Sequence, residues 1–289
     1  MAIPFENFLS IPPQVHPLFP ECGAPRPLAG LYLGLRLQER GSPQRPWIYA
    51  NFLSSLDGRI AVGEDEAEMT VPKAMTSAND FRLLQELQAQ ADCLVVHGAY
   101  LRALAAGRLG NVLQIGQRDS GADLAGWRQD NGLSPQPAIA IVSASLDFPM
   151  PDSIREFGQS CFIATGGAAG RQRMAYWRNQ GHEILVTGQD HWVEAASLVQ
   201  ELARRGYRSV YLGSGPRLLE SMVRGGCLDS LFHTSTHQLL GGEPAVTMIS
   251  GPLLGVAGNL RLRSLYYDPA EPDGAGQFFA HYGRRGKDA

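Results

Sequence analysis

The sequence has few charged residues and no long apolar run. Asp, Glu, Lys and Arg make up 18% of its 289 residues, the net charge is -3, and like charges form no run. It lacks the basic surface that nucleic acids require, and we expect no nucleic-acid partner. No apolar run is long enough to cross a bilayer, so we expect no membrane partner. Residues 1–15 lack a basic start and a long apolar core, and they are not predicted to be a signal peptide.

Cysteine is also scarce. The four cysteines are Cys22, Cys93, Cys161 and Cys227, and none forms a Cys-x-x-Cys pair. The last three lie in apolar surroundings, which favours reduced, buried thiols over a disulfide framework. We therefore predict a cytoplasmic protein.

Motifs of metal sites and hydrolases are absent as well. His233 and His237 would share one face of a strand. They would nevertheless lie roughly 13 Å apart, too far to bind one ion, so no metal site is predicted. The sequence has no Gly-x-Ser-x-Gly, no His-Glu-x-x-His and no paired Cys/His framework, so a hydrolase or a zinc protein lacks support.

Apolar residues make up 44% of the sequence, which is enough for a hydrophobic core. The N-terminal segment is rich in Pro and Gly. We interpret residues 1–45 as an irregular arm with one possible short strand at 30–37. The arm is expected to wrap over the main domain or over a partner subunit, since its apolar residues would otherwise be exposed. Residues 46–289 are predicted to form the main domain.

In this domain, predicted strands and helices alternate. Short apolar runs predict strands at 46–55, 92–98, 138–145, 160–166, 183–188, 209–215, 230–239 and 260–269. Apolar periodicity predicts helices at 77–90, 99–107, 168–181, 192–205 and 216–226. Ser77 is the expected N-cap of the first helix and Gly206 the expected stop after 192–205. Residues 116–136 are predicted to be a surface loop. The pattern predicts an α/β fold whose mostly parallel sheet is covered on both faces, with the last two strands as an antiparallel edge.

The strongest local motif is the strand–Gly–helix junction at 210–216. Gly213, Ser214 and Gly215 would let a phosphate approach the backbone, and the helix that begins at Pro216 offers free N–H groups. A full Gly-x-Gly-x-x-Gly motif would need glycine where Leu218 stands. The junction is therefore equally compatible with a simple tight turn.

Three other positions invite weaker hypotheses. Residues 165–170 form a second strand–Gly–helix turn, which we interpret as a turn only. The Asp57-Gly58 pair after the first strand is typical of a turn, and such a loop can cover a ligand. His97 ends a strand beside Gly98, where it would border a pocket or be a hydrogen-bonded, partly buried histidine.

Taken together and in order, three segments resemble one family. ANFLSSLDGRIA (50–61), MTSANDFRLLQELQAQADCLVVHGAYLRA (75–103) and VYLGSGPRLLESMVRGGCLDSLFHTSTHQLLGG (210–242) are similar to the motifs of the C-terminal reductase domain of the riboflavin-biosynthesis deaminase–reductases. The resemblance covers about residues 46–268 and is weak over 107–160. Three motifs in the right order are far more specific than any one of them.

The resemblance implies a dihydrofolate-reductase-like, three-layer α/β/α fold and a homodimer. It also implies NADPH-dependent reduction of 5-amino-6-(5-phosphoribosylamino)uracil, or of a related pyrimidine- or pteridine-like small molecule, by direct hydride transfer. The positions implied to hold the NADPH phosphates are Gly213, Ser214, Gly215, Pro216, Arg217 and Leu218. Those implied to line the nicotinamide and ribose are Leu53, Ser54, Thr76, His97 and Gly98. Asp57 is the candidate catalytic carboxylate, although it would equally serve to brace its loop.

The sequence departs from the family pattern on the substrate side. Gly213 stands where the family has Glu, Gln88 where it has Arg, and Ala74 where it often has Trp. The segment around Leu104 lacks an expected Thr-Val pair and acidic residue. A non-catalytic homologue that binds nucleotide but has lost its substrate site is therefore the alternative, followed by an unrelated α/β protein or a metal-dependent hydrolase. The apolar strands at 230–239 and 260–268, taken as edge strands, would provide the dimer contact.

Overall fold

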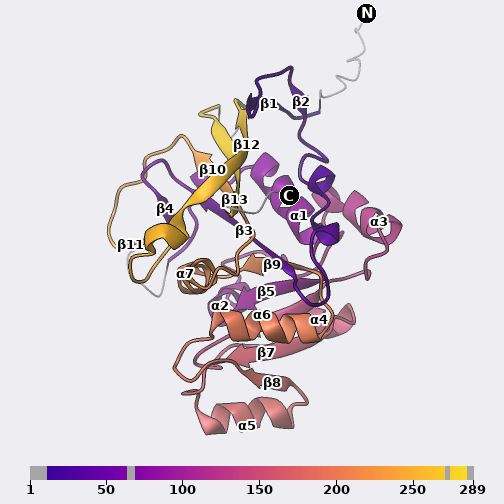
Figure 1. The fold of residues 1–289 in the computed structure, drawn as a ribbon, viewed down its shortest axis with the longest axis vertical. Coiled ribbons are helices and arrows are strands. Elements are labelled where there is room, and N and C mark those ends of the chain that lie inside the picture. The colour runs from indigo at the N-terminus through magenta and orange to yellow at the C-terminus, as the bar shows by residue number, and fades with distance from the viewer. Residues whose placement is uncertain (1–11, 64–68, 271–273, 285–289) are drawn as a thin grey trace, which may run out of the picture.

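A computed structural model describes residues 12–63, 69–270 and 274–284, and one large sheet dominates it (Figure 1). The sheet strands are β1 (Gln14–Phe19), β2 (Arg26–Pro27), β3 (Trp47–Ser54), β5 (Cys93–His97), β6 (Ala138–Val142), β7 (Cys161–Thr165), β8 (Glu183–Val186), β9 (Ser209–Gly213), β10 (Ser230–Thr236), β12 (Leu260–Asp268) and β13 (Gln277–Arg284). β4 (Arg59–Val62) and β11 (Ala245–Thr247) pair separately. The helices are α1 (Ala78–Ala89), α2 (Gly98–Ala105), α3 (Asp123–Asp130), α4 (Asp152–Glu156), α5 (Arg171–Asn179), α6 (Ala195–Arg204) and α7 (Pro216–Arg224).

The sheet is parallel in its larger part and antiparallel at one end. Its spatial order is β2-β1-β12-β13-β10-β3-β9-β5-β6-β7-β8. The strands from β10 to β8 are mutually parallel, whereas β13, β12 and β1 join antiparallel. The antiparallel end is at the top of Figure 1, and β8 with α5 is at the bottom. The predicted α/β fold with a mostly parallel sheet is confirmed.

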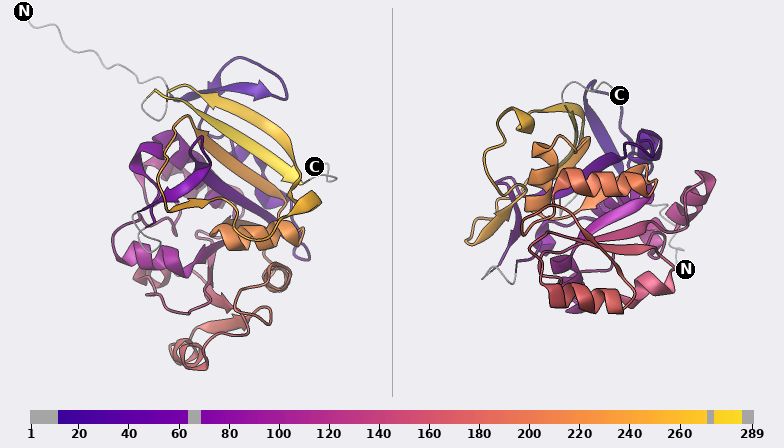
Figure 2. Two further views of the ribbon diagram at one scale, coloured as in Figure 1. Left: turned by 90° about the vertical axis from the view of Figure 1, so that its left-hand side faces the viewer. Right: turned by 60° about the horizontal axis from the view of Figure 1, so that its bottom comes forward.

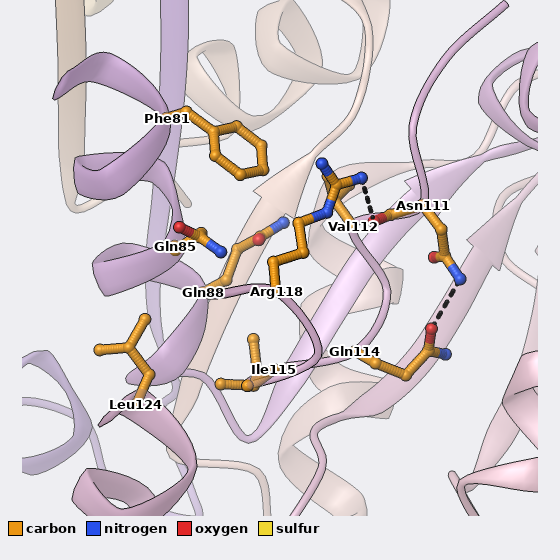
Figure 3. A pocket seen from close by; sticks show the side chains of 10 residues that line it. Phe81, Gln85, Gln88, Asn111, Val112, Gln114, Ile115, Arg118 and Leu124 are labelled. Atoms are coloured by element: carbon orange, nitrogen blue, oxygen red, sulfur yellow. Dashed lines mark hydrogen bonds between the residues drawn. The ribbon is translucent and has the colours of Figure 1, made fainter. Parts of the chain in front are cut away.

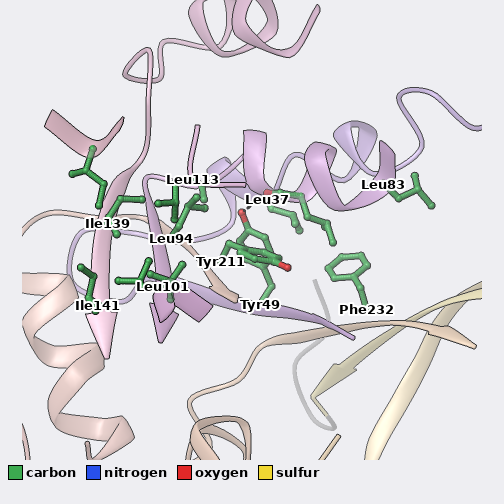
Figure 4. Packing of buried hydrophobic residues seen from close by; sticks show 14 of the residues in the cluster. Leu37, Tyr49, Leu83, Leu94, Leu101, Leu113, Ile139, Ile141, Tyr211 and Phe232 are labelled. Carbon is green, nitrogen blue, oxygen red and sulfur yellow. Dashed lines mark hydrogen bonds between the residues drawn. The ribbon is translucent and has the colours of Figure 1, made fainter. Parts of the chain in front are cut away.

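Two apolar layers cover the sheet. Successive residues of β3 point to opposite faces, so Tyr49 joins one cluster while Ile48 and Ala50 join the other. The first cluster takes its helical residues from α1, α2, α4 and α5, and the second takes them from α6 and α7. Figure 4 shows the first cluster, in which Leu37 of the arm lies beside Tyr49. Helices on both faces make the three layers that were predicted (Figure 2).

Two predicted helix ends, the Ser77 N-cap and the Gly206 stop, are confirmed. The Ser77 hydroxyl accepts a hydrogen bond from the Asp80 backbone N–H at 3.0 Å, which caps α1. Gly206 has φ +77°, a left-handed conformation that ends α6 and that glycine adopts without strain.

The predicted antiparallel C-terminal end of the sheet is confirmed, but its strands are arranged differently. β10 and β12 were taken as edge strands, whereas β13 lies between them and pairs with both. β13 was not predicted. The outer strands of the sheet are β2 and β8, and the proposed dimer contact through β10 and β12 loses its basis because both are paired on two sides.

Two local predictions are also wrong. Residues 30–37, expected to form a strand, contain the 3-10 turn Leu33–Leu35, and a second such turn, Leu37–Glu39, follows. The strand does not form because the buried Glu86 carboxylate accepts the backbone N–H groups of Gly30 and Tyr32 at 2.6 and 2.9 Å. The predicted loop 116–136 contains α3. This helix carries the fully buried Arg128, which donates to the carbonyls of Ala89 and Ala91 at 2.8 Å each.

The described part of the arm packs on the main domain. β1 pairs with β12, and Val15, Leu28, Tyr32 and Leu37 are buried. Gln90 of the main domain accepts the Leu37 N–H and donates to the Tyr32 carbonyl, at 2.8 and 3.0 Å. The arm thus buries these four residues within its own chain, whereas Leu18 and Phe19 remain exposed. Residues 1–11 lie outside the described ranges.

Candidate functional site

A cleft of about 930 Å³ opens at the carboxyl ends of β9, β5 and β6. Its wall includes Ser214, Gly215, Pro216, Arg217 and Leu218 of the junction between β9 and α7, together with His97 at the end of β5. Residues 244–246 and 250–252 also line the cleft. Ligands of parallel α/β sheets bind beyond the carboxyl ends of the strands, and this volume suits a large organic ligand.

The N-terminus of α7 faces this cleft without a side-chain cap. Gly215 is the N-cap in extended backbone, Pro216 opens the helix, and the first turn has no acidic residue. A Cβ built on Gly215 would meet nothing within 4 Å, so the space in front of this turn is open. The first N–H groups of a helix need an acceptor, and the helix dipole favours an anion there. The junction can therefore hold a phosphate.

Arg217 is the cationic side chain among the described residues that line the cleft. Its guanidinium carbon lies 4.6 Å from the ring centre of Trp192, which is about half exposed. The stacking orients the guanidinium at the cleft wall. Glu220, the acidic residue of the same lining, already forms an ion pair with Arg224.

His97 has a defined hydrogen-bonding role. Its Nδ1 accepts the backbone N–H of Tyr100 at 3.2 Å, which caps α2. Burial, with a smaller effect of Arg102, lowers the pKa of His97 to about 4. The ring is therefore neutral at neutral pH, and because Nδ1 accepts, the proton resides on Nε2. Among the described residues Nε2 has no partner, so it is available to a ligand in the cleft.

Gly98 and Gly213 are placed for close packing. A Cβ on Gly98 would lie 3.0 Å from the Ser143 hydroxyl oxygen, and one on Gly213 would lie 3.1 Å from the Tyr211 ring. Neither is among the described lining residues. At both positions the lack of a side chain allows neighbouring groups to pack closely against the strand end beside the cleft.

Leu53 and Ser54 end β3, the neighbour of β9 and β10, whereas Thr76 lies between the 3-10 turn Lys73–Met75 and α1. The Ser54 hydroxyl is 2.8 Å from His233 Nε2, and the Thr76 hydroxyl donates to the Lys73 carbonyl at 2.8 Å. None of the three is among the described residues that line the cleft. The structure thus groups His97 with 214–218 in one cleft, and Leu53, Ser54 and Thr76 are outside its described lining.

Asp57 is held in a network that joins two segments. Its carboxylate accepts hydrogen bonds from the Ser55 hydroxyl, from the Leu240 and Gly241 N–H groups and from Arg59. The Ser55 hydroxyl, followed by the Gly241 N–H, holds the pKa of Asp57 well below its usual range. A carboxylate so stabilised is a poor proton donor at neutral pH, and these contacts favour the bracing role over the catalytic one.

Comparisons with known proteins identify the family and the fold. The family model described as the RibD C-terminal domain matches residues 46–270. The chain belongs to this family. It is 24% identical over 209 residues to the 2,5-diamino-6-ribosylamino-4(3H)-pyrimidinone 5′-phosphate reductase of Archaeoglobus fulgidus, covering 72% of this chain and 87% of the relative. The Aquifex aeolicus reductase of the same name is 22% identical over 225 residues, covering 76% of this chain and 91% of the relative.

Solved structures of RibD-type proteins share the fold. A pyrimidine reductase-like protein of Corynebacterium diphtheriae matches with a TM-score of 0.62 and 19% identity, over 84% of this chain and 93% of that one. Acinetobacter baumannii RibD matches with a TM-score of 0.55 and 20% identity, over 83% of this chain and 58% of that one.

The departures from the RibD C-terminal domain pattern lie in different places. Gly213 is beside the cleft, where the Tyr211 ring and the Val95 carbonyl leave little room for the Cβ of a glutamate. Gln88 instead borders a separate crevice of about 10 Å³ with Phe81 and Gln85 (Figure 3). Leu104 packs on the core and Ala74 accepts a hydrogen bond from Gln238 at 2.8 Å. Gln88, Leu104 and Ala74 are thus outside the described lining of the cleft.

Several lining residues were missed from the sequence. Trp192, Pro244–Val246 and Ser250–Pro252 border the cleft, although only Trp192 had been noted, as a helix start. The available signal was that the loop before α6, like the 213–215 turn, follows the carboxyl end of a parallel strand. The segment after Leu240-Gly241-Gly242 carried no such signal.

The second glycine turn has a packing explanation. A Cβ on Gly166 would lie 2.3 Å from the Asp190 carbonyl oxygen, and one on Gly167 would lie 2.5 Å from that of Gln189. These glycines let 166–167 pack against 189–191, in keeping with the turn-only interpretation.

The described residues also bear on a metal site and a membrane span. No group of three or more His, Cys, Asp or Glu side chains is placed there to hold a metal ion. His233 bonds Ser54, and the His237 ring stacks on Tyr267. No helix in the described ranges has both the length and the apolar character needed to span a membrane.

Proposed function

We propose that this chain is an NADPH-dependent reductase of a phosphoribosylaminopyrimidine, either the substrate in the names of its curated relatives or 5-amino-6-(5-phosphoribosylamino)uracil. The observation that carries the proposal is the uncapped N-terminus of α7 at the wall of a large cleft, in a chain of the RibD C-terminal domain family. The cofactor would supply hydride to the ribose-derived carbon of the substrate and solvent would supply a proton, so that the ribose becomes ribitol.

The residues present fit a dinucleotide. Its phosphates would rest on the 213–218 junction, where Gly215 leaves open space before the helix. Arg217, steadied by Trp192, would meet a 2′-phosphate, which is our reason for preferring NADPH to NADH. His97 would donate from Nε2 to the nicotinamide–ribose part. Leu53, Ser54, Gly98 and Thr76 would complete that region, as the family resemblance implies.

A direct test is turnover. The purified chain should oxidise NADPH when given either phosphoribosylaminopyrimidine, with ribitol-containing product identified by mass spectrometry. The proposal fails if NADPH binds but neither pyrimidine is reduced. That result would favour a nucleotide-binding homologue without its substrate site, the candidate that the Gly213 departure supports.

A further inference from the structure

A second hollow lies at the opposite edge of the sheet from the cleft. It measures about 200 Å³ and is bordered by Trp47 and Ser230, which begin β3 and β10, by Ser264 of β12 and by three arginines. These are Arg40 of the arm, Arg263 of β12 and Arg284 at the end of β13. We call it the arm pocket, because the arm forms one of its walls.

Positive charge dominates the arm pocket. Arg40 donates to the Leu35 carbonyl at 3.0 Å, and Arg284 donates to the Gly226 carbonyl. Neither forms an ion pair with an acidic residue in the described ranges. The carboxylate that borders the pocket, Asp229, is already bonded to Arg45 at 2.9 Å and to the Ile48 N–H at 3.0 Å.

Neutral donors border the same space. Trp47 Nε1 is buried and has no hydrogen-bond partner in the described structure, an arrangement that buried donors rarely tolerate. The His281 ring, which stacks on Phe232, lies 3.0 Å from the Ser230 hydroxyl. Burial, and then Arg40 and Arg263, lowers the pKa of His281 to about 4, so this ring is neutral at neutral pH and adds no charge of its own.

We propose that the arm pocket binds a small oxyanion, namely inorganic phosphate or the phosphate group of a small monoester. Guanidinium groups match phosphate oxygens, and a phosphate would also accept from the unpartnered indole N–H. The hollow is smaller than the pockets that hold drug-sized ligands, which excludes a dinucleotide. Bound phosphate joins Arg40 of the arm to Arg284 of the sheet and so holds the arm in place. This proposal does not depend on the reductase activity.

The test is phosphate-dependent thermal unfolding at constant ionic strength. Phosphate can also bind at the N-terminus of α7, so the measurement is made in a Gly215→Asp background, where the new carboxylate repels anions from the cleft. A binder of the native state raises the Tm saturably. We expect such a rise with inorganic phosphate, and an apparent Kd about tenfold weaker in Arg40→Gln, the loss expected for one charge-assisted hydrogen bond.

Two further variants sharpen the comparison. Arg36→Gln removes an arginine of the same arm segment that pairs with Glu39 and does not border the pocket, so it should leave the phosphate response unchanged. Ser264→Asp places a carboxylate inside the pocket and should abolish the response. Ribose 5-phosphate is titrated in parallel, and tighter binding than inorganic phosphate identifies a monoester as the ligand.

The proposal is overturned if the rise does not saturate, which is a general ion effect. It is also overturned if Arg40→Gln and Ser264→Asp respond to phosphate as Arg36→Gln does.

Discussion

At the residue scale, the two ring nitrogens of His97 have separate roles. Nδ1 caps α2, whereas Nε2 carries the proton and is available to a ligand. The ring is exchanged for a shorter side chain in His97→Asn, whose amide oxygen can still cap the helix. A sequence pattern shows only that a histidine precedes a glycine; it does not show which nitrogen the backbone occupies.

We predict that His97→Asn keeps the wild-type Tm but raises the KM for NADPH by about tenfold, the loss of one hydrogen bond to a ligand. His97→Ala should show the same KM effect and also lose about 1 kcal/mol of stability, because the cap is gone. Steady-state kinetics and thermal melts measure both effects. An unchanged KM in His97→Asn would show that Nε2 has no ligand.

Asp80 makes the free energy of unfolding depend on pH. It is buried, and burial raises its pKa to about 6 despite the hydrogen bond that Thr234 donates to it. The folded state therefore holds this proton more tightly than the unfolded chain, whose Asp pKa is about 3.9. The stabilisation is complete below pH of about 4 and is lost as the pH rises through about 6.

We predict that the free energy of unfolding falls between these limits by about 2–3 kcal/mol on account of Asp80. Asp80→Asn, which keeps the acceptor for Thr234, should flatten this part of the profile. Urea unfolding at a series of pH values measures the slope. An identical slope in the variant would mean that Asp80 does not hold the proton.

At the scale of elements, Asp57 joins the loop after β3 to the Leu240-Gly241-Gly242 segment. We predict that Asp57→Asn loosens this segment and lowers activity, while the pH profile of kcat keeps its shape. The amide cannot accept from both backbone N–H groups as the carboxylate does. A kcat profile that loses one of its limbs in the variant would restore the catalytic interpretation.

The parallel strands could be predicted because they are buried on both faces and appear as short apolar runs, such as 138–142 and 209–213. β13 could not, because Gln277, His281 and Arg284 interrupt its apolar residues, so that it has no continuous apolar run. α3 was missed because it is held by one buried arginine rather than by an apolar stripe. Apolar and other residues alternate in 30–37 as they would in a strand. The Glu86 carboxylate instead accepts backbone N–H groups of this segment, and the two are separated by over fifty residues of sequence.

The site was predictable to a similar extent. The 213–218 junction and His97 follow strand ends, and a sequence pattern places strand ends together once the sheet is known to be parallel. The lining segments 244–246 and 250–252 could not be predicted, because nothing in their composition indicates that the chain returns to α7 there. The role of Asp57 depended on which backbone groups it meets, and these lie more than 180 residues away.

At the scale of the whole molecule, the parallel sheet creates two distinct edges. The cleft lies at the carboxyl ends of the parallel strands. The arm pocket lies at their amino ends, where the arm forms one of its walls. The arm is therefore part of the folded unit over its described residues. A homodimer stays a prediction from the family resemblance, since both strands that were expected to mediate it are already paired within the chain.

The central claim is that the junction between β9 and α7 holds the phosphates of NADPH. Isothermal titration calorimetry of NADPH and NADH against the wild-type chain and Gly215→Asp tests it most directly. The predicted result is one site per chain that prefers NADPH, with at least about a hundredfold loss in the variant, whose carboxylate enters the open space before the helix. Equal NADPH binding by the two proteins, or no binding by either, would contradict the account.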